Sequence, residues 1–160
     1  MCKDIISNDW DKLRESVPSF NVRDKKLRED TTTRLKSYLG KTEHPFMGLS
    51  GIQVGVDFNC TLLRLKGWKE HRVVFNLKVD KEIGSQLSRE RCMSEPLVYY
   101  IVKRPFIILA SWTEANGKRK SEWLKDRNAA IFCHEYDHQN GILIHDIGEV
   151  DEKSTSRISC

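Results

Sequence analysis

The feature that most constrains this chain is a pair of histidines four residues apart, in the segment His134-Glu135-Tyr136-Asp137-His138. Residues at positions i and i+4 lie about one turn apart on one face of an α-helix, so both imidazoles can reach one metal ion if the segment is helical. Glu135 sits at the edge of that face, where its carboxylate can address a water held by the metal. We therefore predict a metal-binding helix over residues 125–140, with an apolar side at Ala129, Ala130, Phe132 and Cys133 and a C-cap at Gly141.

Two histidines leave a catalytic metal one protein ligand short, because open sites commonly use three protein ligands and a water. The candidates are Cys92 upstream, and His145, Asp146 or Glu149 downstream. The downstream residues require the chain to fold back on the helix. Cys92 lies between two strand-like runs, where the end of a strand can present a thiolate, although a cytosolic cysteine is more often an inert core thiol. The residues by themselves leave the third ligand open.

The rest of the chain combines a second helical pattern with several strand-like runs. A glycine-rich ordered loop running into a strand is expected over residues 46–56, after Pro45, and Asn116-Gly117 is a strong hairpin signal. The remaining expected elements are a helix over 24–39 and strands over 61–65, 72–79, 97–102 and 106–113. The predicted fold class is α+β, with antiparallel strands packed around a C-terminal metal-binding helix and with an N-terminal helix.

Length, charge and cysteine usage limit the remaining choices. The 160 residues, 39% of them hydrophobic, suit one catalytic domain over residues 1–150, and the polar residues 151–160 are expected to form a flexible tail. No apolar run reaches the length of a membrane span, and residues 1–4 do not begin a secretory signal. Five cysteines without a C-x-x-C pair fit a reducing compartment. We expect a cytoplasmic monomer with no membrane or DNA partner.

The net charge of +4 is mild, and acidic and basic residues alternate along the chain. Solubility alone explains such a balance, and the same holds for the basic run Lys118-Arg119-Lys120 beside the predicted hairpin turn. The charge also allows approach to an anionic surface such as a ribosome.

Three segments resemble the motifs of peptide deformylases, in the expected order. Gly48-Leu49-Ser50-Gly51-Ile52-Gln53 is similar to G-L-A-A-x-Q, and Glu90-Arg91-Cys92-Met93-Ser94 is similar to E-G-C-L-S. The histidine segment, followed by Gly141, is similar to H-E-x-D-H-x-x-G. Near the N-terminus, Asp11-Lys12-Leu13-Arg14 with Val17-Pro18 resembles the opening of the family. The resemblance covers nearly the whole chain, and three motifs together are far more specific than H-E-x-x-H alone.

The resemblance implies an enzyme that hydrolyses the formyl group from N-formylmethionyl peptides, the N-termini of nascent chains. It implies one divalent metal held by Cys92, His134 and His138, with Fe²⁺ as the usual physiological ion. A metal-bound water would be the nucleophile, and Glu135 would act as general base and then as general acid. The ligand set itself does not fix the ion, because Cys/His/His with water also suits Zn²⁺, Ni²⁺ or Co²⁺.

Further roles follow from the same resemblance. The side-chain amide of Gln53 and the backbone N–H of Met93 would donate to the oxyanion, and Gly48 would line the substrate channel. Well-placed donors of this kind are each worth about 10²–10³ in rate, and an amide needs no neutralising charge. Met47 and Ile131 are expected walls of a pocket for the methionine side chain, whereas core packing is the favoured interpretation of Phe132.

Four positions depart from the family pattern. Phe46 replaces the first glycine of G-x-G, and Gly51 replaces the second alanine of the first motif. Arg91 replaces the glycine before Cys92, which costs energy if the backbone there needs a positive φ. Cys133 replaces a glutamine before His134. None of these changes removes a predicted ligand, the predicted base or the predicted oxyanion donor.

A supporting shell is expected around the ligands. We predict that Asp137 pairs with Arg104 and steadies the metal-binding helix, with Glu90 nearby, because such outer partners commonly orient metal ligands.

Two other functions fit H-E-x-x-H. A zinc metallopeptidase would draw its third ligand from downstream of the helix. A non-catalytic binding module stabilised by metal would close the site with four protein ligands and would have no need of Glu135.

Overall fold

The computed structural model describes residues 5–7 and 9–155, and side chains as far as residue 153. Its helices are α1 (Trp10–Leu13), α2 (Lys25–Lys36), the 3₁₀ helix η1 (Gly51–Val54), α3 (Arg127–Gln139), α4 (Ile144–Ile147) and α5 (Glu152–Thr155). Its strands are β1 (Gly48–Ser50), β2 (Cys60–Leu63), β3 (Arg72–Ile83), β4 (Gln86–Cys92), β5 (Glu95–Arg104), β6 (Ile107–Glu114), β7 (Arg119–Lys125) and β8 (Gly148–Val150). The predicted α+β class is confirmed.

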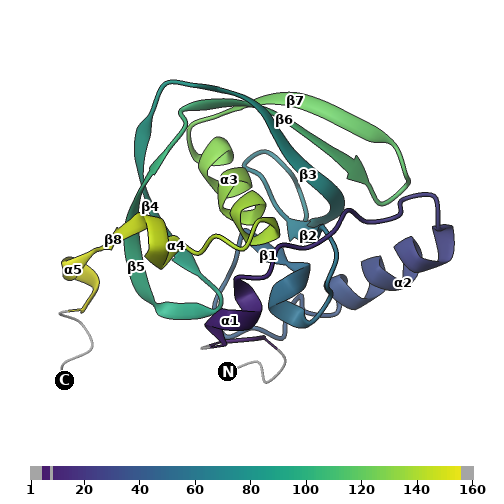
Figure 1. Cartoon of the computed structure of the whole chain (residues 1–160), viewed down its shortest axis with the longest axis horizontal. Helices are drawn as coiled ribbons and strands as arrows, with labels where there is room; N and C mark the ends of the chain where they lie inside the picture. Colours follow the sequence, from purple (N-terminus) through teal and green to yellow (C-terminus); the bar gives the residue numbers. More distant parts are fainter. Residues whose placement is uncertain (1–4, 8, 156–160) are drawn as a thin grey trace.

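The strands form two antiparallel sheets that enclose one helix. The five-stranded sheet has the order β1-β2-β3-β6-β7, and the three-stranded sheet has the order β4-β5-β8. Helix α3 lies in the middle of the molecule, with β3, β6 and β7 on one side and β4 and β5 on another (Figure 1). The helix that carries the histidine segment is therefore central rather than peripheral.

Alternation along β6 explains how this sheet covers α3. Ile108, Ala110 and Trp112 are buried on one face of the strand, as the two-residue period of a strand requires. The Trp112 ring packs against Phe132 of α3, with ring centroids 5.9 Å apart. Phe132 is fully buried in this cluster, in agreement with the core role expected for it.

The hairpin prediction is confirmed, but two strands, β4 here and β8 near the C-terminal end, were not predicted. Gly117 donates its backbone N–H to Glu114 O at 2.8 Å, and Thr113 pairs with Arg119 across the turn. Strand β4 was not predicted because its sequence, Gln-Leu-Ser-Arg-Glu-Arg-Cys, is mostly polar and only Cys92 is buried. It forms because β5 supplies a long antiparallel partner, from Gln86 opposite Arg104 onward.

The glycine-rich segment was predicted in the wrong order. The strand β1 comes first and the compact turn η1 follows it, because Gln53 folds its side chain back onto the strand end. The Oε1 atom of Gln53 accepts the backbone N–H of Ser50 at 2.9 Å. At Gly51, an added Cβ would lie 2.5 Å from the sulfur of Cys60, so the glycine lets this thiol pack directly on the turn.

The C-terminal residues include structure that the sequence analysis did not foresee. Strand β8 pairs with β5, and Asp151 forms an ion pair with Arg89 at 2.6 Å. Helix α5 occupies part of the segment expected to be a tail, and residues 156–160 lie outside the described residues. The division into one catalytic domain over 1–150 and a flexible tail stays a prediction. Among the helices described, none has the length and apolar character needed to cross a bilayer.

Candidate metal centre

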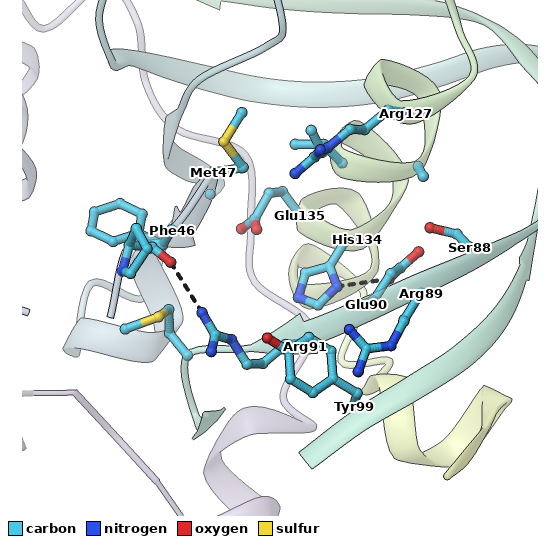
Figure 2. Close-up of a pocket in the computed structure, with 15 residues that line it drawn as sticks. Phe46, Met47, Ser88, Arg89, Glu90, Arg91, Tyr99, Arg127, His134 and Glu135 are labelled. Carbon is cyan, nitrogen blue, oxygen red and sulfur yellow. Dashed lines mark hydrogen bonds and ion pairs between the residues drawn. The ribbon is translucent and has the colours of Figure 1, made fainter. Parts of the chain in front are cut away.

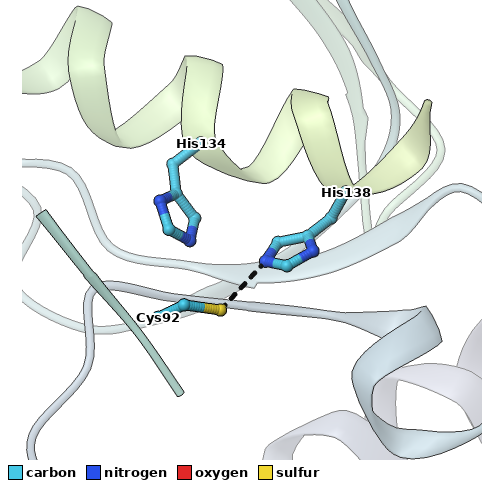
Figure 3. Close-up of side chains that lie close together, drawn as sticks. All are labelled: Cys92, His134 and His138. Atoms are coloured by element: carbon cyan, nitrogen blue, oxygen red, sulfur yellow. Dashed lines mark hydrogen bonds between the residues drawn. The ribbon is translucent and has the colours of Figure 1, made fainter. Parts of the chain in front are cut away.

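The side chains of Cys92, His134 and His138 lie close together (Figure 3). The sulfur stands at the end of β4, and both imidazoles project from the same side of α3. One possible ligand atom from each residue lies within 4.8 Å of the others, and this is the one such group found in the part of the chain described. The sulfur of Cys92 lies 3.3 Å from Nε2 of His138. The structure thus assembles the three predicted ligands, whose role as ligands stays a prediction.

The surroundings of Cys92 favour its thiolate form over the thiol. All three side chains are buried, with Cys92 5% exposed and His138 2% exposed. Burial by itself raises the pKa of the Cys92 thiol, but the adjoining imidazoles of His138 and His134 outweigh it and hold that pKa well below its usual range. The thiolate is the form that coordinates metals.

A buried carboxylate fixes the orientation of His134. Nδ1 of His134 lies 3.0 Å from Oε2 of Glu90, which leaves the other ring nitrogen, Nε2, for the shared site. Glu90 in turn accepts two hydrogen bonds from Arg104, at 2.8 and 2.9 Å. Burial raises the pKa of Glu90, but Arg104 and His134 dominate and bring it down to about 2. Glu90 is therefore an anion under ordinary conditions.

Arg104 also reaches the metal-binding helix directly. Its Nη1 donates to Oδ2 of Asp137 at 2.5 Å, so the predicted pairing of Asp137 with Arg104 is confirmed. The guanidinium is 4% exposed and holds two carboxylates, one from β4 and one from α3. One cation therefore joins the strand that carries Cys92 to the helix that carries both histidines, and so fixes the relative position of these three side chains.

Glu135 lies against the backbone of Gly48 and is nearly fully buried, at 3% exposed. A Cβ added to Gly48 would lie 2.1 Å from Oε1 of Glu135, so only glycine lets the carboxylate occupy this position. Burial raises the pKa of Glu135. A carboxylate with a raised pKa exchanges protons more readily near neutral pH than an exposed one.

Gln53 directs its amide toward the same centre. Its Nε2 donates to the Cys92 sulfur at 3.3 Å and to Oγ of Ser94 at 3.0 Å. The side chain is 1% exposed and is locked at its other end by Ser50. Met93 lies directly after Cys92 and lines the adjoining cavity.

A cavity of about 240 Å³ opens beside His134 and Glu135 (Figure 2). Met47, Gly48 and Ile131 line it as expected, whereas Phe132 does not. Its complete lining comprises Pro45, Phe46, Met47, Gly48, Ser88, Arg89, Glu90, Arg91, Met93, Tyr99, Arg127, Ala130, Ile131, His134 and Glu135. The sequence analysis did not foresee Arg89, Tyr99 and Arg127 here, because no local pattern brings them to one place.

Three of the residues that depart from the family pattern, Arg91, Phe46 and Cys133, fit their surroundings without displacing the three predicted ligands. Arg91 does not have a positive φ, so the arginine imposes no strain of that kind. Phe46 lines the cavity, and its backbone carbonyl oxygen lies 2.9 Å from Nε2 of His71. Cys133 is buried in the core cluster with Trp112 and Phe132, and burial raises its pKa to about 12.

The downstream candidates for the third ligand are engaged elsewhere. Asp146 forms an ion pair with Arg14 at 2.7 Å, and His145 faces Glu95, with Nδ1 3.5 Å from that carboxylate. Glu149 lies on β8 and is exposed. The metallopeptidase arrangement therefore has no counterpart among the residues that surround the two histidines.

The residues present fit a divalent transition metal. One thiolate and two imidazoles form a donor set of the kind used in sites with an open position. Within the described chain, Oε2 of Glu135 is a buried polar atom beside the centre that has no hydrogen-bond partner. Buried polar atoms are nearly always partnered, so this oxygen is consistent with a site that binds water or substrate. Nδ1 of His138 also has no partner, but the nitrogen of that ring that faces Cys92 is Nε2.

Comparison with known proteins agrees with this geometry. A family model described as polypeptide deformylase matches residues 3–153. A peptide deformylase of Desulfotalea psychrophila is 30% identical over 140 residues, covering 84% of this chain and 80% of the relative. One of Finegoldia magna is 29% identical over 150 residues, covering 92% and 89%. The solved peptide deformylase of Synechococcus elongatus superimposes with a TM-score of 0.80 at 25% identity, covering 96% of this chain and 82% of that one.

Proposed function

This chain belongs to the polypeptide deformylase family, whose members remove N-formyl groups by metal-dependent hydrolysis, and we propose the residues through which it does so. The observation that carries the proposal is the buried set of Cys92, His134 and His138 beside a cavity that also contains Glu135. The substrate class is N-formylmethionyl peptides, and the products are formate and a free α-amino group.

We propose that Cys92, His134 and His138 hold one divalent ion. A bound ion of this kind supplies a Lewis acid, which can lower the pKa of water from 15.7 to about 7. The lowered pKa of Cys92 supports this role, because a thiolate needs no proton removed before it coordinates. Glu90 supports it through His134, whose Nδ1 it fixes.

Glu135 moves the proton in this proposal. Its carboxylate takes a proton from the attacking water and returns it to the nitrogen of the leaving amine as the C–N bond breaks. The close approach of Glu135 to Gly48 holds the carboxylate buried at the edge of the cavity, and this burial raises its pKa; both support the assignment.

Gln53 and Met93 are proposed to stabilise the negative charge that develops on the formyl oxygen. Nε2 of Gln53 is a neutral donor already directed at the ligand sulfur, and the backbone N–H of Met93 follows that sulfur in the chain. Gly48, Met47 and Ile131 line the cavity and are proposed to receive the methionyl residue, an apolar and unbranched group.

Release of formate from formyl-Met-Ala-Ser by anaerobically purified protein tests the proposal, with bound metal measured on the same sample. Glu135→Gln is expected to retain the metal and to lower kcat by about 10²–10⁴. Cys92→Ala is expected to lose the metal. An E135Q variant with unchanged activity would overturn the catalytic assignment, and a binding module that uses metal only for stability would behave in that way.

Fe²⁺ is the ion we propose for the native enzyme, with Zn²⁺, Ni²⁺ or Co²⁺ as alternatives that the same ligands suit. Iron, unlike zinc, is redox-active, and the thiolate beside it can then be oxidised, so we expect the iron-loaded enzyme to lose activity in air. Metal analysis after anaerobic purification, together with activity before and after exposure to air, distinguishes iron from the other three.

We propose further that the enzyme acts in the cytoplasm as a monomer, without DNA or membrane partners, and that it approaches the ribosome surface. The unpaired thiols of Cys60, Cys92 and Cys133 support a reducing compartment, and the net charge of +4 supports an anionic docking surface. Light scattering at several protein concentrations tests the monomer. Co-sedimentation with ribosomes at low and high salt tests the docking.

A further inference from the structure

Three arginines line the cavity without any part in the proposed hydrolysis. Arg89 and Arg91 come from β4, and Arg127 begins α3. Figure 2 shows Arg91 and Arg89 on one side of His134 and Arg127 on the other side, beside Met47. The mouth of the cavity is therefore flanked by cations from two separate elements.

The acidic residues of the cavity do not neutralise these arginines. Glu90 is engaged with Arg104 and His134, and the carboxylate of Glu135 is buried against Gly48. Arg89 has its own partner, Asp151, at 2.6 Å. Among the residues described, neither Arg91 nor Arg127 forms an ion pair with a carboxylate. Two cationic side chains at the cavity thus remain available to an anion.

Arg91 is held in place at the cavity by neutral contacts. Its Nη2 donates to the carbonyl oxygen of Pro45 at 3.4 Å, so the side chain extends from β4 across to the loop before β1 (Figure 2). Its guanidinium also lies 5.3 Å from the centroid of the Tyr99 ring, over which Arg89 packs more closely, at 3.7 Å. A guanidinium held by such contacts loses less freedom on binding than a free side chain, and its remaining N–H groups suit a carboxylate.

The location of Arg91 limits what it can reach. It directly precedes the ligand Cys92, so its Cα lies about 3.8 Å from that of Cys92. An extended peptide advances about 3.3–3.6 Å per residue. A substrate whose formyl group sits at the metal centre therefore brings the next one or two residues within range of an arginine side chain.

Resting on the proposed function, we propose that Arg91 and Arg127 select formylated peptides that carry a carboxylate side chain in the first two residues after formylmethionine. Each guanidinium would donate a charge-assisted hydrogen bond to the carboxylate of the substrate at the partly exposed mouth of the cavity. Exposed ion pairs are worth little individually, so we expect acidic peptides to be preferred about fivefold over their neutral isosteres in kcat/KM.

The test compares tripeptides that differ only in one charge. Formyl-Met-Asp-Ala amide is measured against formyl-Met-Asn-Ala amide, and formyl-Met-Ala-Asp amide against formyl-Met-Ala-Asn amide. The amidated C-terminus removes the terminal carboxylate, so that only the side chain can provide the anion. The native metal-loaded enzyme is used, and the ratio of kcat/KM within each pair is the quantity of interest.

Variants locate the source of the preference. Arg91→Gln and Arg127→Gln are each expected to reduce the acidic-to-neutral ratio about twofold, and the double variant is expected to bring it close to one. Arg23→Gln removes the same charge from an exposed position away from the cavity and is expected to keep the wild-type ratio. About 1 M salt is expected to abolish the preference in the wild type, because it screens exposed charges.

The outcomes separate this inference from the proposed function. Formate released equally from acidic and neutral peptides by the wild type overturns the inference and leaves the hydrolysis intact. A preference that survives in both single variants and in the double variant also overturns it. If the metal-loaded protein releases formate from none of the four peptides, the proposed function itself fails, and the inference fails with it.

Discussion

Oε2 of Glu90 lies 3.0 Å from Nδ1 of His134, and this contact orients the imidazole toward the sulfur of Cys92. The same carboxylate is held by Arg104, which also holds Asp137, one turn further along the helix. One buried cation thereby positions a strand and a helix that lie far apart in the sequence.

Replacing Glu90 by Gln is expected to weaken metal binding by about 10–100-fold, because partners of metal-bound histidines contribute on that scale. The amide keeps the shape of the side chain but removes the anion that fixes His134. Metal affinity measured by competition with a chelator gives the result. An affinity equal to that of the wild type would show that Glu90 does not orient the ligand.

Replacing Asp137 by Asn is expected to have a smaller effect than E90Q on the same measurement. Arg104 keeps its two hydrogen bonds to Glu90, at 2.8 and 2.9 Å, and loses only the charge on the helix. The deformylation rate and the metal content should fall together. Normal values of both in D137N would contradict a steadying role for the pair.

Replacing Gly48 by Ala is expected to lower kcat about 100-fold while leaving the metal in place. The added methyl group would lie 2.1 Å from Oε1 of Glu135, so the carboxylate must move, and misplacement by about 1 Å costs on that order in rate. The double variant with Glu135→Gln is the control. If Gly48 acts through Glu135, the two losses are strongly non-additive, whereas full additivity would count against this explanation.

Replacing Gly51 by Ala is expected to lower the free energy of unfolding by about 1–3 kcal/mol, the usual cost of overpacking. The new Cβ would lie 2.5 Å from the sulfur of Cys60. In a Cys60→Ala background the same change should cost clearly less, because the sulfur is gone. Urea unfolding of all four proteins at one metal concentration measures the coupling, and equal costs in both backgrounds would rule out this contact as the cause.

The described cysteines are expected to differ in their reaction with iodoacetamide. Burial raises the pKa of Cys60 and of Cys133 to about 12, so at pH 8 only about 10⁻⁴ of each is thiolate. Their alkylation should be slow and should rise about tenfold per pH unit below that pKa. Cys92, whose pKa the imidazoles lower, should react faster once a chelator has removed the metal, and should be protected when the metal is restored.

Peptide mapping by mass spectrometry at pH 7, 8 and 9 assigns the labelled thiols. Equal labelling of Cys92 with and without metal would argue against its role as a ligand. Rapid labelling of Cys60 at pH 8 would show that its thiol is less buried than the structure indicates.

Much of the molecule was readable from local sequence. The spacing of His134 and His138, with Glu135 between them, predicted a helix and the chemistry of the face that carries them, and the apolar residues before His134 predicted its buried side. Asn116-Gly117 predicted the hairpin, because turn conformation depends on the residues in the turn itself. The polar composition of residues 86–92 gave no sign of β4. A polar segment of this kind adopts the strand conformation because it pairs with a neighbouring strand, here β5.

Tertiary structure decided which groups complete the site. The sulfur of Cys92 lies 46 residues before His138 in the chain and reaches it through the register of β4 against β5. The approach of Gly48 to Glu135 and the two-sided contact of Arg104 depend on how both sheets close around α3. Helical periodicity and turn conformation depend on residues close together in the chain, so a short stretch of sequence is enough to predict them. The meeting of distant side chains depends on the packing of the whole fold.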